Sequence, residues 1–224
     1  MAFTRTWDAA GIVCVGVFNP AIFQPEWLAA RGLIQRTEAE GAEIRVITPD
    51  VAEFKIKWAQ LQVIRERLTA GTETPDDFPL LRDLVVGAFQ LLEHTPITAV
   101  GLNRQMHFRV EDPAAWHHIG HVFAPKAIWR RHMKNPGLKL LTIKAQRPDD
   151  LSGEININVN PVMVATTSNT VEVFVNSHLD VRHTPTAGAV SKLMAEQWER
   201  TMDFASELGT RLITDALNEK EPRE

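Results

Sequence analysis

Residues 113–148 contain no aspartate or glutamate, yet they hold seven of the lysines and arginines and four of the eight histidines. The bases are Lys126, Arg130, Arg131, Lys134, Lys139, Lys144 and Arg147. The whole chain carries 24 bases and 28 acids, a net charge of −4, so the rest of the chain is strongly acidic. A positive segment inside an acidic protein indicates a localised contact with something anionic.

Within this basic band the sequence predicts a helix over residues 125–134. Helical spacing would place Lys126, Arg130 and Lys134 in one stripe with Arg131 beside it. Such a stripe could hold phosphates, and Trp129 on its flank could stack on a base. The same pattern fits a solvated helix face, or bases paired with acids elsewhere in the chain. These four bases are the predicted anion site, for nucleic acid or an acidic protein surface.

Histidines raise the question of a metal. His117 and His121 are four residues apart on an expected helix over 113–123, a spacing that can chelate zinc. The metalloprotease glutamate is missing, no cysteine is near, and a third ligand would have to come from His107 or His178. The alternative is that the helix buries its apolar side and the histidines lie at the boundary. The sequence therefore predicts no metal and no other cofactor.

A second group of polar residues comes from an expected hairpin. A loop at 168–170, with Asn169 in the left-handed conformation, would pair residues whose numbers sum to 338. Every apolar residue then faces an apolar partner. The polar pairs would be Asn156 with Arg182, Asn158 with Asp180, and Asn160 with His178.

We predict that this polar surface contacts a ligand or a partner, although polar residues are also ordinary on the outer face of a half-solvated sheet. Asp180 near His178 could act in acid–base chemistry. No activated nucleophile and no glycine-rich phosphate loop accompanies the pair. We therefore assign no catalytic residue, and an enzymatic role is the less favoured interpretation.

The elements that must position these groups follow from hydrophobic period and turn residues. The N-terminal part predicts strands at 12–18, 43–48 and 97–110, and helices at 25–34 and from Pro79 to about Thr95. In 51–69 the apolar alternation changes phase without a turn residue, which predicts one long strand with a bulge. Residues 138–183 predict a three-stranded meander.

The last predicted element is a helix over 185–218, capped by Thr184 and on the order of 50 Å long. Its apolar edge, which includes Trp198, could serve a dimer. The predicted fold is α+β, with a mainly antiparallel sheet, helices on one face and a long C-terminal helix. We expect a single domain over 1–224, with a possible subdivision into 1–112 and 113–218 and a frayed tail at 219–224.

The composition also bears on the cellular compartment and on membrane insertion. The single cysteine, Cys14, allows no internal disulfide and predicts a reducing, cytoplasmic location. The N-terminal apolar run, 9–18, is too short to span a bilayer and is interpreted as a buried strand.

Two stretches resemble an uncharacterised, sporadically distributed prokaryotic protein family of about this size. They are Ile97-Thr-Ala-Val-Gly-Leu-Asn-Arg and Val171-Glu-Val-Phe-Val-Asn-Ser-His-Leu-Asp. In that family a strand of the form R-x-G-L-R-Y-x-N precedes a helix, a β-meander and a long C-terminal helix; here the tyrosine is missing. The resemblance supplies no activity and no site residue. Its patchy distribution suits a mobile-element, toxin or antiviral defence system.

The first functional hypothesis is a non-enzymatic binding or adaptor protein that assembles with itself or a protein partner through its long helix and open sheet. The alternative is a nucleic-acid-binding or other anion-binding protein that uses the basic band at 126–147. A metal-dependent hydrolase is the third.

Overall fold

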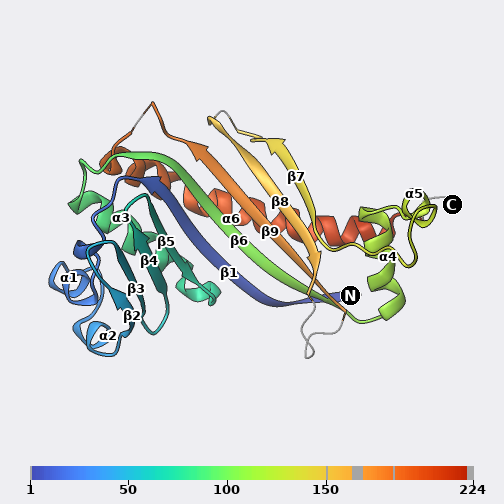
Figure 1. Ribbon diagram of the computed structural model, residues 1–224, viewed down its shortest axis with the longest axis horizontal. Coiled ribbons are helices and arrows are strands. Elements are labelled where there is room, and N and C mark those ends of the chain that lie inside the picture. Colours follow the sequence, from blue (N-terminus) through green and yellow to red (C-terminus); the bar gives the residue numbers. More distant parts are fainter. Residues whose placement is uncertain (1, 150, 163–168, 184, 221–224) are drawn as a thin grey trace.

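The structure is a computed structural model that describes residues 2–149, 151–162, 169–183 and 185–220. Its strands form one nine-stranded antiparallel sheet in the order β2-β3-β4-β5-β1-β6-β9-β8-β7 (Figure 1). The strands are β1 (Phe3–Gly16), β2 (Glu43–Ile47), β3 (Val51–Lys55), β4 (Gln60–Ile64), β5 (Arg67–Thr72), β6 (Ile97–Val110), β7 (Leu141–Gln146), β8 (Gly153–Pro161) and β9 (Thr170–Asp180). The α-helices are α1 (Pro25–Ala30), α2 (Arg36–Glu40), α3 (Phe78–Leu91), α4 (Pro113–Phe123), α5 (Ala127–Arg130) and α6 (Ala187–Asn218), and two 3₁₀ turns are η1 (Pro20–Ile22) and η2 (Pro75–Asp77). The predicted fold class is confirmed.

The connectivity repeats itself once along the chain. In the first half, β1 is followed by two short helices, the meander β2–β5 and the helix α3; in the second, β6 is followed by two short helices, the meander β7–β9 and the helix α6. Each meander returns its last strand beside the first strand of its own half, so β5 lies next to β1 and β9 next to β6. Since β1 and β6 pair antiparallel at the centre, an approximate two-fold axis perpendicular to the sheet relates the halves.

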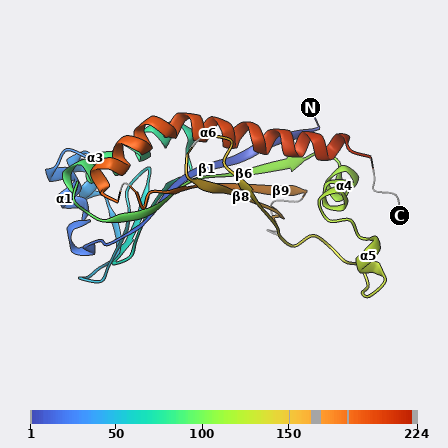
Figure 2. The same ribbon diagram turned by 90° about the horizontal axis from the view of Figure 1, so that it is seen from above.

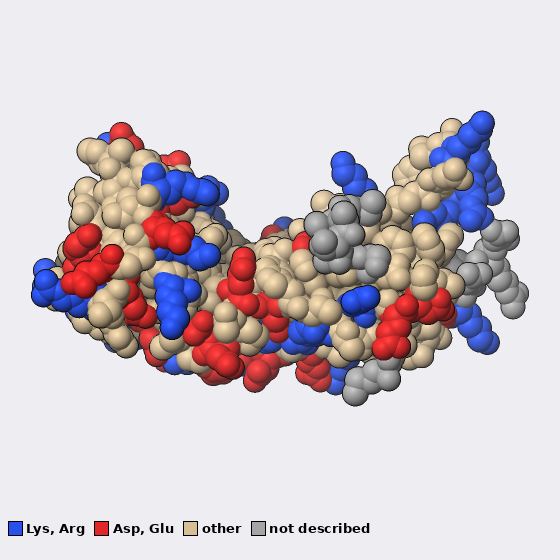
Figure 3. All heavy atoms as spheres, turned by 90° about the horizontal axis from the view of Figure 1, so that it is seen from below, with Lys and Arg blue, Asp and Glu red and all other residues tan. Residues whose placement is uncertain are grey.

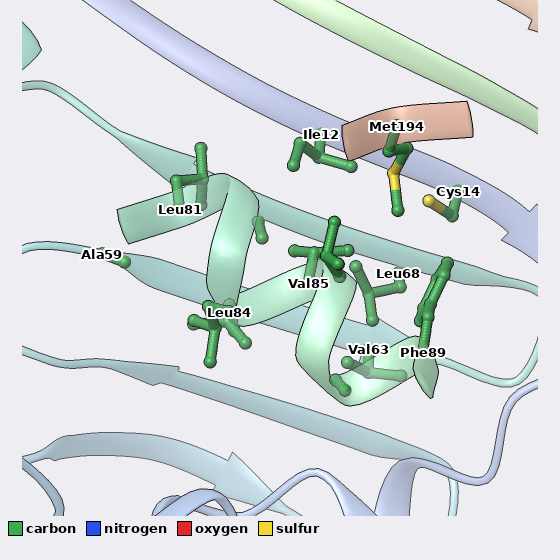
Figure 4. Close-up of a cluster of buried hydrophobic side chains, with 14 of the residues drawn as sticks. Ile12, Cys14, Ala59, Val63, Leu68, Leu81, Leu84, Val85, Phe89 and Met194 are labelled. Carbon is green, nitrogen blue, oxygen red and sulfur yellow. The ribbon is translucent and has the colours of Figure 1, made fainter. Parts of the chain in front are cut away.

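The helices α3 and α6 lie on the same face of this sheet, and α6 runs along its length (Figure 2). Figure 4 shows the α3 side of the core, where Leu84, Val85 and Phe89 meet residues of β1, β4 and β5 together with Met194 of α6. The apolar edge of α6 also packs into the core, where Trp198 is only 1% exposed. That edge is therefore part of the core and not a free assembly surface. Gly209 lets the helix approach closely, since a Cβ there would lie 2.6 Å from the Cε atom of Met106.

A buried carboxylate ties the central strands to α6. Asp8 of β1 accepts two hydrogen bonds from Arg104 of β6, at 2.9 and 2.7 Å, and one from Arg5 at 2.9 Å. Arg104 also donates to the backbone oxygen of Met202 at 2.8 Å, and Arg5 donates to the hydroxyl of Thr210 at 2.9 Å. One carboxylate thus positions two guanidinium groups that both reach the long helix.

Several local predictions need correction. The stretch 51–69 is not one bulged strand: it turns twice, after Lys55 and after Ile64, and so belongs to three strands. The first turn is closed by a hydrogen bond from the Ile56 amide to the Ala59 oxygen at 2.8 Å, with no glycine, proline or asparagine at its centre. The long helix begins at Ala187, and its cap is the hydroxyl of Thr186; the predicted cap, Thr184, lies outside the described residues.

The hairpin register also differs from the prediction. Asn169 has the expected left-handed conformation, with φ of 55°. However, the paired residues of β8 and β9 sum to 332, so Asn156 lies opposite Asn176, Asn158 opposite Phe174, and Asn160 opposite Glu172. The predicted pairs with Arg182, Asp180 and His178 are wrong. The error is six residues, an even number, so each side chain stays on its predicted face. The predicted sum of 338 also pairs Met163 with Val175 and Ala165 with Val173, and both Met163 and Ala165 lie outside the described residues.

The first prediction concerns Asp8. Asp8→Asn should lower the free energy of unfolding by roughly 3–5 kcal/mol, because it leaves two largely buried guanidinium groups without their counter-charge. Urea denaturation of the purified variant measures this loss. The matched control is Asp50→Asn, whose partner Arg65 and whose own side chain are 69% and 70% exposed; it should cost less than about 1 kcal/mol. Equal losses in the two variants would contradict the role given to Asp8.

Candidate functional site: the open face of the sheet

Among the described elements, no helix lies along the centre of the sheet face opposite α3 and α6 (Figure 2). Side chains alternate between faces along a strand, so the residues that neighbour buried core positions point to this open side. The chain is hollowed on this side between its two ends, which project beyond the middle (Figure 3). Amide side chains are frequent here and come from four strands: Gln60, Gln62, Asn103, Gln105, Asn156, Asn158, Asn160 and Asn176.

Five of the six predicted partner residues share this face. Asn156, Asn158 and Asn160 follow one another on β8, and His178 and Asp180 lie on the same side of β9. Their neighbours differ from those predicted: His178 lies opposite Glu154 and next to Gly101. Arg182 comes after the end of β9.

Four residues that the sequence analysis did not assign to this face form a contact network at its centre. Trp7 of β1 stacks on His107 of β6, with ring centroids 4.5 Å apart. The His107 Nε2 atom lies 3.1 Å from the Glu172 carboxylate of β9, and Gln105 donates to the same carboxylate oxygen at 2.6 Å. The His107 and Glu172 side chains are 20% and 19% exposed, so this network is held in place but still reaches the surface. The sequence did contain a signal for this surface, because Asn103, Gln105 and His107 are polar at every second position of the predicted strand over 97–110.

Next to this network the two asparagines of the central strands hold each other. Asn176 donates to the Oδ1 atom of Asn103, whose side chain is largely buried. Gly101 leaves the room for this pair, because a Cβ there would lie 2.8 Å from the Asn176 amide nitrogen. The floor of the hollow is therefore polar, close-packed and fixed in orientation.

Carboxylates on this face are neutralised by their neighbours. A hydrogen bond from Lys144 is the main cause that lowers the pKa of Glu154, and Asn156 adds a second one. In the same way Arg182 holds the pKa of Asp180 well below its ordinary value, first through side-chain hydrogen bonds. Gln62 and Arg45 lower the pKa of Glu53 on β3. Each of these three acids thus has a base beside it: Arg45 for Glu53, Lys144 for Glu154 and Arg182 for Asp180.

At one side of the network the open face contains a pocket of about 280 Å³. Trp7 and Trp58 line it together with Gln60, Gln105 and Lys55. The Trp58 indole donates to Glu38 at 2.7 Å, which fixes its ring. Indole surfaces beside amide groups suit a partner that presents both apolar and hydrogen-bonding atoms.

The basic band separates into parts with different surroundings. Arg147 and Asp149 form an ion pair with side chains only 3% and 8% exposed, and Lys144 pairs with Glu154. All four bases of the predicted anion site lie on the arm formed by residues 125–140, which projects from one end (Figures 2 and 3). There α5 is a single turn that ends at Arg130, so Lys134 cannot continue a helical stripe with Lys126 and Arg130. The expected three-residue stripe is wrong, and Arg131 and Lys134 are exposed beyond the helix.

The structure also bears on the histidine pair of α4. Among the described residues, no group of three or more histidine, cysteine, aspartate or glutamate side chains could hold a metal ion. On α4 the ring of His118 lies 2.9 Å from the backbone oxygen of Glu219, and Trp116 donates to the Thr170 oxygen at 3.2 Å. These contacts attach α4 to the end of α6 and to β9.

Comparison with known proteins gave no match, either to a protein-family model or to a curated protein. Within the part of the chain that the structure describes, no helix is both long and apolar enough to cross a membrane.

The buried pair at the end of the band yields a pH prediction. The hydrogen bond and charge of Arg147 keep the pKa of Asp149 below its ordinary value, against the opposing effect of burial. A lowered folded-state pKa adds stability that is present above the unfolded pKa, about 4, and is lost as the pH falls through the folded value. Asp149→Asn should therefore destabilise the protein most at pH 7, and its deficit should shrink by pH 3. Denaturant titrations across that range measure the difference; Glu40→Gln, which affects an exposed pair with Arg36, is the control. A deficit that does not change with pH would contradict this assignment.

Proposed function

We propose that this protein is a non-enzymatic, cytoplasmic binding protein that holds a polar protein partner on the open face of its sheet. One observation carries the proposal: both long helices cover the same face, and the opposite face of the same sheet is hollowed and rich in ordered amide side chains.

The chemistry of the face favours such a partner. Amide groups both donate and accept hydrogen bonds, so they match the backbone and uncharged side chains of a polypeptide. Because the carboxylates are paired with neighbouring bases or amides, the face imposes little desolvation cost from unpaired charge. Trp7 and Phe174 add apolar area among the amides. A role in a prokaryotic defence or mobile-element system rests on the sequence resemblance alone.

Asn158→Arg tests this function, because it places a long charged side chain in the middle of β8 on the open face. From extracts of the native host, we expect the variant to capture at least tenfold less of the partner than the wild-type protein does. The matched control is Gln90→Arg, the same type of change at an exposed position of α3.

Both variants should unfold within about 0.5 kcal/mol of the wild type, so that a loss of capture reports the surface and not stability. If Asn158→Arg captures as much as Gln90→Arg, or if nothing specific is captured by the wild type, the open face is not the binding surface.

A second candidate function, nucleic-acid binding, is favoured by one observation on the arm. Arg131 and Lys134 follow Trp129 closely in the chain, Trp129 is 51% exposed, and the arm forms a concentrated positive end of the molecule (Figure 3). Bases next to an exposed indole suit single-stranded nucleic acid, where phosphates bind the cations and a base stacks on the ring.

A gel-shift titration with a single-stranded oligonucleotide at several salt concentrations tests this candidate. The double variant Arg131→Glu/Lys134→Glu should weaken binding and lower the slope of log affinity against log salt by roughly 0.7 for each lost phosphate contact. Arg31→Glu/Arg36→Glu, at the other end of the molecule, makes the same charge change and should have no such effect (Figure 1). Equal slopes for the two double variants would exclude the arm as the nucleic-acid-binding surface.

A further inference from the structure

The two halves of the sheet differ at their outer edges. In the first half β3 is covered by a further strand, β2. The equivalent of β3 in the second half is β7, the third strand outward from the central one, and it is the last strand of the described sheet on that side. The repeated topology therefore leaves a strand position beside β7 that the described residues do not fill.

The two edge strands also differ in protection. β2 carries Glu43 and Arg45, and its pairing with β3 is interrupted by a bulge between Ile44 and Val46. Charges and bulges are the usual devices that keep an edge from pairing with another chain. β7 pairs with β8 without a shift over its whole length, so its outer edge is regular. Its one charged side chain, Lys144, is engaged by Glu154 of the neighbouring strand.

Exposed apolar side chains accompany the regular edge. Ile143, on the helix side of β7, is 47% exposed, and Leu140 just before the strand is 56% exposed. The helix α6 packs mainly against β6 and β9, and β9 is separated from β7 by β8. Ile143 therefore has apolar neighbours on β8 and room for another on its outer side.

We infer that a second copy of this chain pairs with β7, edge to edge and antiparallel, with Ile143 opposite Ile143 of the partner subunit. The two-fold axis is perpendicular to the sheet, as antiparallel pairing of identical strands requires. Two sheets then continue into one, and the open faces of both copies lie on the same side.

The register follows from self-complementarity. With Ile143 at the axis, Leu141 meets Ala145 on the helix side, and Thr142 meets Lys144 on the open side. In this register the numbers of two opposed residues add up to 286. Opposed side chains must lie on the same face of the sheet, so the nearest alternative registers have sums of 284 and 288. One of them sets Lys144 against its own copy, which is repulsive, and the other pairs only residues 141–143 of β7, whereas the register at Ile143 pairs residues 141–145. The register at Ile143 avoids both.

Disulfide trapping tests the pairing directly, because directly opposed strand residues come close enough for a disulfide and diagonal ones do not. The native Cys14 is fully buried and will not interfere. Under mild oxidation, Ile143→Cys should form a covalent dimer in high yield, whereas Thr142→Cys and Lys144→Cys should not. Light scattering of the wild-type protein should give twice the 25.2 kDa mass of one chain.

Each alternative outcome overturns part or all of the inference. A wild-type mass of 25.2 kDa at high concentration, with no trapping at Ile143, removes the dimer. Trapping through Thr142→Cys or Lys144→Cys instead of Ile143→Cys contradicts the register. If the mass is doubled but none of the three variants is trapped, the copies meet elsewhere and the β7 edge belongs to a different partner. Val17→Cys, which is 66% exposed and directly follows β1, controls for random collision.

Discussion

The buried carboxylate of Asp8 sets the relation between the sheet and its long helix. It bridges arginines from β1 and β6, and both arginines continue to α6, so three elements that are far apart in sequence meet at one charge. A pair this buried is costly to desolvate and is stabilising only with good geometry and further hydrogen bonds, which both guanidinium groups have. The hydrophobic effect alone would hold α6 on an apolar surface, but it is not directional. The Asp8 contacts add a fixed position along the sheet.

Fixing both long helices to one face determines what the other face can do. Strand residues with odd and even positions are separated onto opposite sides, so the apolar half of each strand is buried and the polar half is collected on one surface. On that surface the side chains are already held by one another, as in the Trp7, His107 and Glu172 network and the Asn103–Asn176 pair. Side chains that are ordered before binding lose less entropy when a partner arrives, which is the physical advantage of such a face.

Much of this architecture could be predicted from the sequence, because period and turn residues are local signals. The strand over 97–110 and the helix over 113–123 have the predicted bounds, and the polar residues of β8 lie on the predicted side. The register of β8 on β9 could not be obtained, since registers that differ by an even number place the same residues on the same face and match apolar to apolar equally well. Turns at 56–59 and 65–66 lacked the residues that normally mark a turn.

The candidate site was harder to predict than the fold. Trp7, Gln105, His107 and Glu172 come from three strands that are distant in sequence, and only the order of the sheet brings them together. The charge count of the basic band could not show that Arg147 has a buried acidic partner or that Lys144 is paired across a strand. Likewise, the apolar edge of α6 looked equally suited to a dimer or a core, and only the packing shows that Trp198 is inside.

The most direct measurement of the central claim, that the open face is the binding surface, is thiol labelling of a single introduced cysteine inside and outside the cell. Cys14 is fully buried, and burial raises the pKa of its thiol, so it stays unreactive. We predict that Asn158→Cys reacts quickly with a maleimide in the purified protein and at least tenfold more slowly in cells of the native host, while Gln90→Cys reacts alike in both. Equal reaction of Asn158→Cys in the two settings would show that nothing covers the open face, and would contradict the account.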